Sequence, residues 1–255
     1  MMTGKSRRMS RLFVGEHKLC LLSPLDHGGW LGPVPGIDSP RRISEAVIRG
    51  GANALLASPG FLRAVAPVVP PAIGLVLRVS LTAGLSEQGT QETPIASLET
   101  AIRMDADAVV VSVFFGRSGD LEIYRWLAAL IDASQQYEMP VVAEMMPPAE
   151  RSYEADAIAH ATRIGMEIGA DVVKTNYCGQ REAFRHIVDG AAVPIIVAGG
   201  PAQGDDDSTV ALVRDCISAG AAGVAIGRRV WQSPDPAALT TKIRSAMLAA
   251  GPDQG

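Results

Sequence analysis

One lysine of this chain ends a strongly apolar run, where its amine could react with a carbonyl group. The run Asp171–Val173 is followed by Lys174 and Thr175. Burial disfavours the charged form of an amine and lowers its pKa, so a lysine in such a place can attack a ketone and form an imine. Arginine stays charged and cannot form an imine. Only four of the 23 basic residues are lysines, so this chemistry gives a reason for a lysine at this position in an arginine-rich chain. The alternative is a lysine whose stem lies along the strand end while its amine reaches water.

Groups that could move protons follow or end two other apolar runs. Asp26 and His27 stand directly after the run Cys20–Leu25, and Glu144 lies near the end of the run Pro140–Met145. A carboxylate held beside an amine can serve as a general acid or base when a C–C bond forms or breaks. The alternative roles are capping of a loop for Asp26 and an ion pair with a neighbouring arginine for Glu144.

Glycine-rich segments after the last two apolar runs are typical of a phosphate site. Gly199 and Gly200 follow one run, and Gly227 and Arg228 follow the other. Backbone N–H groups in such turns donate hydrogen bonds to phosphate oxygens, and Arg228 or Arg229 could add a charged fork. The four histidines and three cysteines lack the spacing of metal ligands, so the sequence predicts neither a metal ion nor a cofactor.

Eight short apolar runs, each bounded by glycine, proline or polar residues, are expected to be the buried strands that position these groups. The runs are Cys20–Leu25, Ala52–Ala57, Gly74–Val79, Ala108–Phe115, Pro140–Met145, Asp171–Lys174, Pro194–Ala198 and Gly223–Ile226. Segments with apolar residues at helical spacing alternate with them: Pro40–Arg49, Ile95–Met104, Leu121–Tyr137, Tyr153–Ile168, Arg181–Val188, Asp207–Ala219 and Pro236–Ala250.

Eight strand–helix repeats favour a single (β/α)8 TIM barrel of the α/β class over an open doubly wound sheet. The active site of such a barrel lies at the carboxyl ends of its strands, where all the residues above fall. Ser112, near the end of the fourth run, and Tyr177, three residues past Lys174, are therefore further candidates for binding substrate. Arg78 lies at the end of the third strand.

Length and composition limit the other possibilities. The 255 residues, 47% of them hydrophobic, are expected to form one domain over 1–255, with loose tails at 1–12 and 250–255. A net charge of −4 and the lack of a basic stripe argue against nucleic-acid binding. No run reaches the ~18 apolar residues of a membrane span, and no signal-peptide core follows the N-terminus, so a cytoplasmic protein is expected.

Several motifs together indicate a family. They are PLDHGGWLGP at 24–33, GGANALL at 50–56, AIRMDADAV at 101–109, GADVVKTNYCG at 169–179, AGGP at 198–201 and GAAGVAIGRRVWQ at 220–232. Over residues 20–232 the chain resembles the class I aldolases grouped with archaeal-type fructose-bisphosphate aldolase and 2-amino-3,7-dideoxy-D-threo-hept-6-ulosonate synthase.

The resemblance implies a metal-independent aldolase, which is a carbon–carbon lyase acting through a Schiff base on Lys174. It also implies that Asp26 and His27 lie near the reacting carbons, and that the glycines named above hold a substrate phosphate together with Arg228. The partner is then a phosphorylated small molecule. Members of the family usually form large homo-oligomers, of which a decameric ring is one form.

One departure from the family pattern concerns proton transfer. Members commonly carry an acid–base tyrosine in a YPRG-like stretch after the fifth strand, and here Met146 occupies that position. A thioether cannot transfer protons. Tagatose-bisphosphate aldolase looks similar at Glu144, so either Glu144 takes this role, or Tyr153 or Tyr177 reaches the site, or the reaction is not a normal aldol cleavage.

The substrate that we expect first is that of the heptulosonate-synthase branch, which joins aspartate semialdehyde to a triose phosphate in the biosynthesis of aromatic amino acids or secondary metabolites. Cleavage of fructose bisphosphate is the second reading. A non-catalytic barrel that binds a sugar phosphate is an alternative from another class. A barrel isomerase with Glu144 as base and Lys174 as an electrostatic clamp is a further one.

Overall fold

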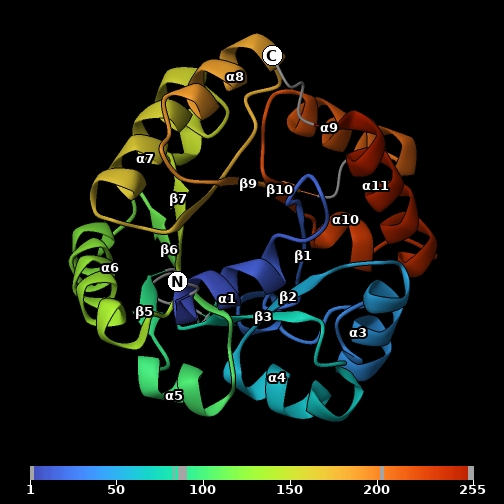
Figure 1. Ribbon diagram of the computed structural model, residues 1–255, viewed down its shortest axis with the longest axis horizontal. Coiled ribbons are helices and arrows are strands. Elements are labelled where there is room, and N and C mark those ends of the chain that lie inside the picture. The colour runs from blue at the N-terminus through green and yellow to red at the C-terminus, as the bar shows by residue number, and fades with distance from the viewer. Residues whose placement is uncertain (1–2, 83, 86–90, 202–203, 252–255) are drawn as a thin grey trace.

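Eight parallel strands close into a barrel in the computed structural model, which describes residues 3–82, 84–85, 91–201 and 204–251 (Figure 1). The order around the barrel is β1-β10-β9-β8-β7-β6-β3-β2. The bounds are β1 Cys20–Pro24, β2 Ala54–Ala57, β3 Gly74–Arg78, β6 Ala108–Phe114, β7 Val141–Met146, β8 Val172–Thr175, β9 Ile195–Ala198 and β10 Gly223–Ala225. The predicted (β/α)8 barrel is confirmed, and the predicted runs match these strands to within two residues at either end.

Helices surround the barrel as an outer layer (Figure 1). They are α3 Pro40–Arg49, α4 Pro59–Val65, α5 Leu98–Arg103, α6 Asp120–Ser134, α7 Ala155–Glu167, α8 Arg181–Asp189, α9 Asp206–Ser218 and α11 Pro236–Ala250. Sequence periodicity did not predict α4, a short helix that is stabilised by its N-terminal residues. Ser58 accepts a hydrogen bond from the Phe61 N–H, and Pro59 occupies the first turn. Among the described residues, no helix has the length and apolar character needed to cross a membrane.

Alternation along each strand separates the barrel interior from the surface beneath the helices. One cluster of buried residues fills the interior: Leu12, Cys20, Leu22, Ala54, Leu56, Val76, Ala108, Val110, Val142, Val172, Ile196 and Ala225. On four of the strands, the next inward-pointing residue lies two positions further along the chain and reaches the cavity. These residues are Arg78, Ser112, Glu144 and Lys174. Glu144 pairs in register with Ser112 on one side and with Lys174 on the other, so these groups form a polar layer on an apolar floor.

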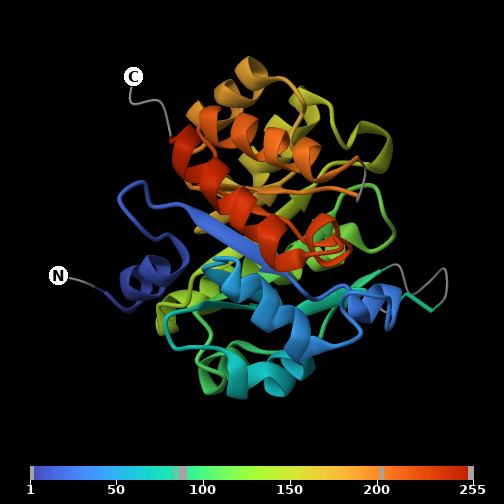
Figure 2. The ribbon, with the colours of Figure 1, turned by 90° about the vertical axis from the view of Figure 1, so that its right-hand side faces the viewer.

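The N-terminal segment is a correction to the sequence prediction. Residues 4–12 were expected to be a loose tail, but they form α1 Gly4–Leu12 at the end of the barrel away from α2 Gly28–Leu31 (Figure 2). Leu12 is buried in the interior cluster, and its carbonyl accepts a hydrogen bond of 2.6 Å from Asn53 Nδ2. The helix is ordered because it covers apolar side chains that the open end of the barrel would expose to water. Residues 252–255 of the other predicted tail lie outside the described residues.

A small antiparallel hairpin lies over the mouth of the barrel. It consists of β4 Ser80–Thr82 and β5 Glu92–Pro94, inserted between β3 and α5. Strand β4 packs against α2, and β5 packs against α6. The sequence analysis did not predict this hairpin, because its strands are three residues long and show no clear alternation.

Candidate active site

A cavity of about 340 Å³ opens at the carboxyl ends of the barrel strands. It contains every predicted site residue except Tyr177: Asp26, His27, Ser112, Glu144, Lys174, Gly199, Gly200, Gly227 and Arg228 line it. The structure therefore brings together residues that are spread over some 200 positions of the sequence. Their convergence follows from the barrel, because parallel strands all end at the same edge.

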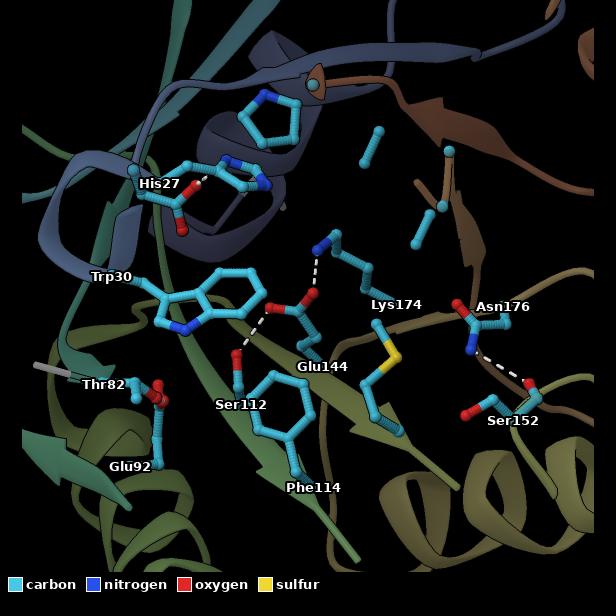
Figure 3. A pocket seen from close by; sticks show the side chains of 18 of the residues that line it. His27, Trp30, Thr82, Glu92, Ser112, Phe114, Glu144, Ser152, Lys174 and Asn176 are labelled. Atoms are coloured by element: carbon cyan, nitrogen blue, oxygen red, sulfur yellow. Dashed lines mark hydrogen bonds and ion pairs between the residues drawn. The ribbon is translucent and has the colours of Figure 1, made fainter. Parts of the chain in front are cut away.

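Lys174 and Glu144 form a buried pair at the centre of this cavity (Figure 3). Lys174 Nζ donates a hydrogen bond to Glu144 Oε1, and both side chains are almost fully buried. Adjacent parallel strands hold them, because Glu144 on β7 and Lys174 on β8 are register partners. The amine lies beside a group that can accept its proton, and it faces space that a substrate can enter.

Arg78 is the hub of the charges around this pair. Its Nη2 lies 2.7 Å from Glu144 Oε2, and its Nε donates a 2.6 Å hydrogen bond to Asp26 Oδ2. Its Nη1 donates to Ser112 Oγ, and Ser112 donates in turn to Glu144 Oε2 at 2.6 Å. The ion pair between Glu144 and a barrel arginine was one sequence alternative. The structure contains that ion pair in addition to the contact with Lys174.

The electrostatics of the cluster keep its carboxylates ionised. Burial raises the pKa of Glu144, but the charges of Lys174 and then Arg78 outweigh this effect and lower that pKa to about 2. Burial likewise opposes ionisation of Asp26, and Arg78 is the strongest of the groups that hold the Asp26 pKa well below its usual range. These carboxylates raise the pKa of Arg78 in return, against the effect of its burial. At neutral pH Glu144 is therefore ionised, and it is a weak base as long as both cations lie beside it.

Replacing Arg78 by glutamine should cost about 3–5 kcal/mol of folding free energy at pH 7, because it leaves two buried carboxylates without their shared cation. In the native protein these carboxylates have lowered pKa values. The stabilisation they contribute is present above their ordinary values of about 4 and is lost as pH falls further. Urea unfolding should therefore show a difference between wild type and Arg78→Gln that shrinks between about pH 4 and pH 2. An equal difference at both pH values would contradict this electrostatic origin.

Asp26 and His27 stand where β1 leaves the barrel. His27 Nδ1 lies 3.4 Å from Asp26 Oδ1, and neither atom has a hydrogen-bond partner within the described part of the chain. The imidazole packs edge-on against Trp231, with 5.7 Å between the ring centroids. Both side chains line the cavity, and these two atoms are themselves buried in its wall.

The other side of the cavity is lined by two glycine-rich turns and an arginine. Gly199 and Gly200 follow β9, and Gly227 leads into α10 Arg228–Trp231. Gly200 has a φ of 67°, in the left-handed region that favours glycine. Arg229 was also considered as a phosphate ligand, but its Nε donates a 2.9 Å hydrogen bond to the carbonyl of Gly199. Arg229 therefore supports the loop, while Arg228 lines the cavity.

Tyr177 corrects the predicted set of binding residues, because its side chain does not line the cavity. The ring packs edge-on against Phe184 of α8, with 5.1 Å between centroids, and burial raises its pKa to about 12. Alternation explains this position: Lys174 and Asn176 point inward, so Tyr177 points toward the helices. Tyr153 does line the cavity and remains within the site.

The sequence analysis overlooked two functional-site residues and undervalued a third. Asn176 lines the cavity and donates a 3.0 Å hydrogen bond to the Ser152 carbonyl. Its inward direction follows from the spacing of two residues after Lys174, a signal that the sequence contained. Arg78 was noted only as a strand end, although the same spacing after Val76 points it inward. Glu92 lines the cavity from the hairpin, and no periodicity marked it.

Side chains that could bind a metal ion are dispersed in the part of the chain that the structure describes. No cluster of three or more histidine, cysteine, aspartate or glutamate side chains there is arranged to hold a metal ion. Cys20 and Cys216 are buried, and burial raises both of their thiol pKa values. The polar groups that line the cavity include the Lys174 amine, carboxylates and guanidinium groups.

Comparison with known proteins places this barrel among aldolases. The chain is 33% identical over 246 residues to 2-amino-3,7-dideoxy-D-threo-hept-6-ulosonate synthase of Halobacterium salinarum, and the match covers 96% of this chain and 91% of the relative. It is 30% identical over 250 residues to 2-amino-4,5-dihydroxy-6-oxo-7-(phosphonooxy)heptanoate synthase of Streptomyces griseus, with 97% and 91% covered.

Solved structures share the fold. An archaeal fructose 1,6-bisphosphate aldolase has a TM-score of 0.86 to this chain at 22% identity, over 97% of this chain and 100% of the other. Another archaeal aldolase structure, whose catalytic lysine carries the carbinolamine intermediate of its substrate, also has a TM-score of 0.86, at 22% identity and with 96% and 99% covered. The DeoC/LacD family aldolase pattern matches residues 20–233. This chain therefore belongs to the DeoC/LacD family of aldolases, and the predicted resemblance to class I aldolases is confirmed.

Proposed function

We propose that Lys174 is the Schiff-base lysine of this aldolase and that the chain joins a phosphorylated ketone to an aldehyde. The observation that carries this proposal is the position of Lys174. Its amine is buried in the cavity, paired with the carboxylate of Glu144. A lysine held only for structure would not need a carboxylate partner, an open cavity and glycine-rich turns with an arginine in one place.

The first step is formation of the imine. Glu144 takes a proton from the Lys174 ammonium, and the neutral amine adds to the ketone carbon to give a carbinolamine. Loss of the carbinolamine oxygen as water leaves an iminium ion. The charge of Lys174 lowers the Glu144 pKa, so the ion pair itself opposes this transfer, and addition of the amine to the ketone carbon draws the transfer forward. When that charge is gone, Glu144 holds the proton more tightly and can return it to the leaving hydroxyl.

The second step forms the C–C bond. Glu144, ionised again after loss of water, takes a proton from the carbon next to the iminium and gives an enamine, whose carbon attacks the aldehyde carbon. The aldehyde oxygen takes up a proton and becomes a hydroxyl, and water then releases the product and regenerates the Lys174 amine. Glu144 is the proposed proton carrier at the hydroxyl, since Met146 at the family tyrosine position lines the cavity without a transferable proton. Asp26 assists by orienting the carbinolamine.

The phosphate of the ketone is proposed to bind the backbone N–H groups at Gly199, Gly200 and Gly227 and the guanidinium of Arg228. Replacing Arg228 by glutamine should raise KM for dihydroxyacetone phosphate about tenfold, since a hydrogen bond to a charged group contributes about 1.5–3 kcal/mol and Arg228 is only half-buried. Unphosphorylated dihydroxyacetone is the matched control, and its kcat/KM should change less than about twofold. Equal losses for both ketones would remove Arg228 from the phosphate site.

The acceptor is proposed to be aspartate semialdehyde, as in the heptulosonate-synthase branch. The Streptomyces griseus relative is named for a seven-carbon product with a 2-amino group, a 6-oxo group and a 7-phosphate. A bond between its fourth and fifth carbons joins a four-carbon amino aldehyde to a three-carbon ketone phosphate. Incubation of this chain with both compounds should give such a product by mass spectrometry and NMR. Cleavage of fructose bisphosphate without any such product would favour the second reading.

The charges that line the cavity favour aspartate semialdehyde with a ketone phosphate over fructose bisphosphate as the substrate. Strand β3 lies four strands from β9 in both directions around the barrel, so the hairpin after β3 faces the proposed phosphate site across the mouth. That hairpin contributes the carboxylate of Glu92 to the cavity. A second phosphate at this end would meet a negative group. We also propose that the chain acts as a homo-oligomer in the cytoplasm, in line with the family resemblance.

A further inference from the structure

Glu92 is a buried carboxylate that the aldol mechanism does not use. It lies on β5, beside Thr82 in the wall of the pocket (Figure 3). Its Oε1 accepts a 2.6 Å hydrogen bond from Ser80 Oγ, and its Oε2 accepts one of 2.7 Å from Thr82 Oγ1. The side chain is only 6% exposed. Two hydroxyl groups thus fix the direction of the carboxylate without neutralising its charge.

The charges around Glu92 leave it undercompensated. The nearest cation is Arg78, whose Nη1 is 3.8 Å from Glu92 Oε1. Arg78 already pairs with Asp26 and Glu144 at 2.6 and 2.7 Å. In this cluster Asp26, Glu92 and Glu144 share the cations of Arg78 and Lys174, and the His27 imidazole lies beside Asp26 rather than beside Glu92. A ligand with a positive group beside Glu92 would balance the cluster, and the cost of burying the carboxylate would then be offset.

A guanidinium lies at the rim of the same cavity. Arg117 follows β6, and its Cζ is 4.1 Å from the centroid of the Phe114 ring. A guanidinium stacked on an aromatic face keeps its N–H groups in its own plane, where they can bind a carboxylate. The loop of Arg117 is joined to the hairpin of Glu92 through their sequence neighbours, because Gln91 Nε2 donates a 2.9 Å hydrogen bond to Ser118 Oγ.

We propose that Glu92 and Arg117 form the acceptor subsite, in which Glu92 binds the ammonium group and Arg117 the carboxylate of an amino-acid aldehyde. The subsite lies on the opposite side of the barrel mouth from the proposed phosphate loops. Donor and acceptor are then sorted by charge, with phosphate at the β9 and β10 ends and ammonium at the hairpin. This inference rests on the proposed aldol function and specifies which part of the acceptor each residue recognises.

Three aldehydes test the contacts of Glu92 and Arg117 separately; two have four carbons and one has three. Aspartate semialdehyde carries both charged groups, succinic semialdehyde lacks the ammonium group, and 3-aminopropanal lacks the carboxylate. With dihydroxyacetone phosphate as donor, wild type should have its highest kcat/KM for aspartate semialdehyde. Glu92→Gln should lower that value about 10–100-fold and leave succinic semialdehyde within about threefold. Arg117→Gln should lower kcat/KM for aspartate semialdehyde about threefold to tenfold, a smaller loss because Arg117 is exposed. It should leave kcat/KM for 3-aminopropanal nearly unchanged.

The controls separate recognition from folding and from imine chemistry. Glu122→Gln and Arg125→Gln change exposed residues of α6 outside the cavity and should leave all three aldehydes unaffected. Borohydride trapping of the imine with dihydroxyacetone phosphate should be the same in wild type and Glu92→Gln. Equal losses for aspartate and succinic semialdehyde in Glu92→Gln would overturn the subsite. The subsite would also be overturned if the donor imine of the wild-type protein can be trapped but the protein prefers succinic semialdehyde. If no imine can be trapped in the wild-type protein, the aldol function itself would be contradicted.

Discussion

Replacement of Lys174 by methionine is expected to reduce the aldol reaction about 10⁵- to 10⁶-fold, as in enzymes that lose their covalent nucleophile. Methionine has nearly the same length as lysine but no amine, so it fills the same space without forming an imine. Steady-state assays of product formation would measure the loss. Without the iminium ion there is no electron sink next to the bond that forms, and binding of the substrate cannot replace it.

The matched control is Lys242→Met. Lys242 lies on α11 and pairs with Asp206 at 3.6 Å, outside the cavity. This variant should keep kcat within about twofold of wild type, since an exposed ion pair contributes about 0–1 kcal/mol to stability. Urea unfolding of Lys174→Met would show that the protein is folded. A folded Lys174→Met protein with activity within tenfold of wild type would contradict the assignment of the nucleophile.

The second large effect is expected for Glu144→Gln, which should lower kcat about 10²- to 10⁴-fold. Glutamine keeps the shape of the side chain and can still contact Lys174, Arg78 and Ser112. It cannot accept a proton from the amine or return one to the leaving hydroxyl. Imine trapping should therefore become slow rather than disappear, and single-turnover kinetics with borohydride quenching would measure this.

Ser112→Ala is the control for the hydrogen bonds around Glu144. It removes the 2.6 Å bond to Glu144 Oε2 but leaves the carboxylate in place. We expect a decrease in kcat of about tenfold or less, in line with one hydrogen bond of about 0.5–1.5 kcal/mol. A Glu144→Gln protein with nearly normal kcat would leave Glu144 as an ion-pair partner only. Tyr153, which also lines the cavity, would then be the next candidate for proton transfer.

The positions of Lys174 and Glu144 could be predicted from the sequence because strand alternation determines them. Each stands two residues after a valine that fills the barrel interior, so each must point into the barrel near its mouth. The same rule, applied one step further, excludes Tyr177 and includes Asn176. The error at Tyr177 came from counting its distance from Lys174 along the chain instead of following the direction of successive side chains.

Glu92 and α1 could not be predicted in this way, because long-range contacts determine both. Glu92 faces the cavity because Ser80 and Thr82, ten to twelve residues earlier, hold its oxygens. The helix α1 contains many basic residues and resembles a solvated tail in sequence. Its burial depends on Leu12 and on contacts such as the 2.8 Å ion pair between Lys5 and Asp171 at the far end of the barrel. Local periodicity carries no information about such partners.

The most direct test of the central claim is to locate the covalent adduct. Wild-type protein would be reduced with borohydride in the presence of dihydroxyacetone phosphate, digested, and analysed by peptide mass mapping. The chain has only four lysines, Lys5, Lys18, Lys174 and Lys242, so the result is unambiguous. We predict a single reduced adduct on the peptide that contains Lys174. An adduct on any of the other three lysines, or none at all while aldol product accumulates, would contradict the account.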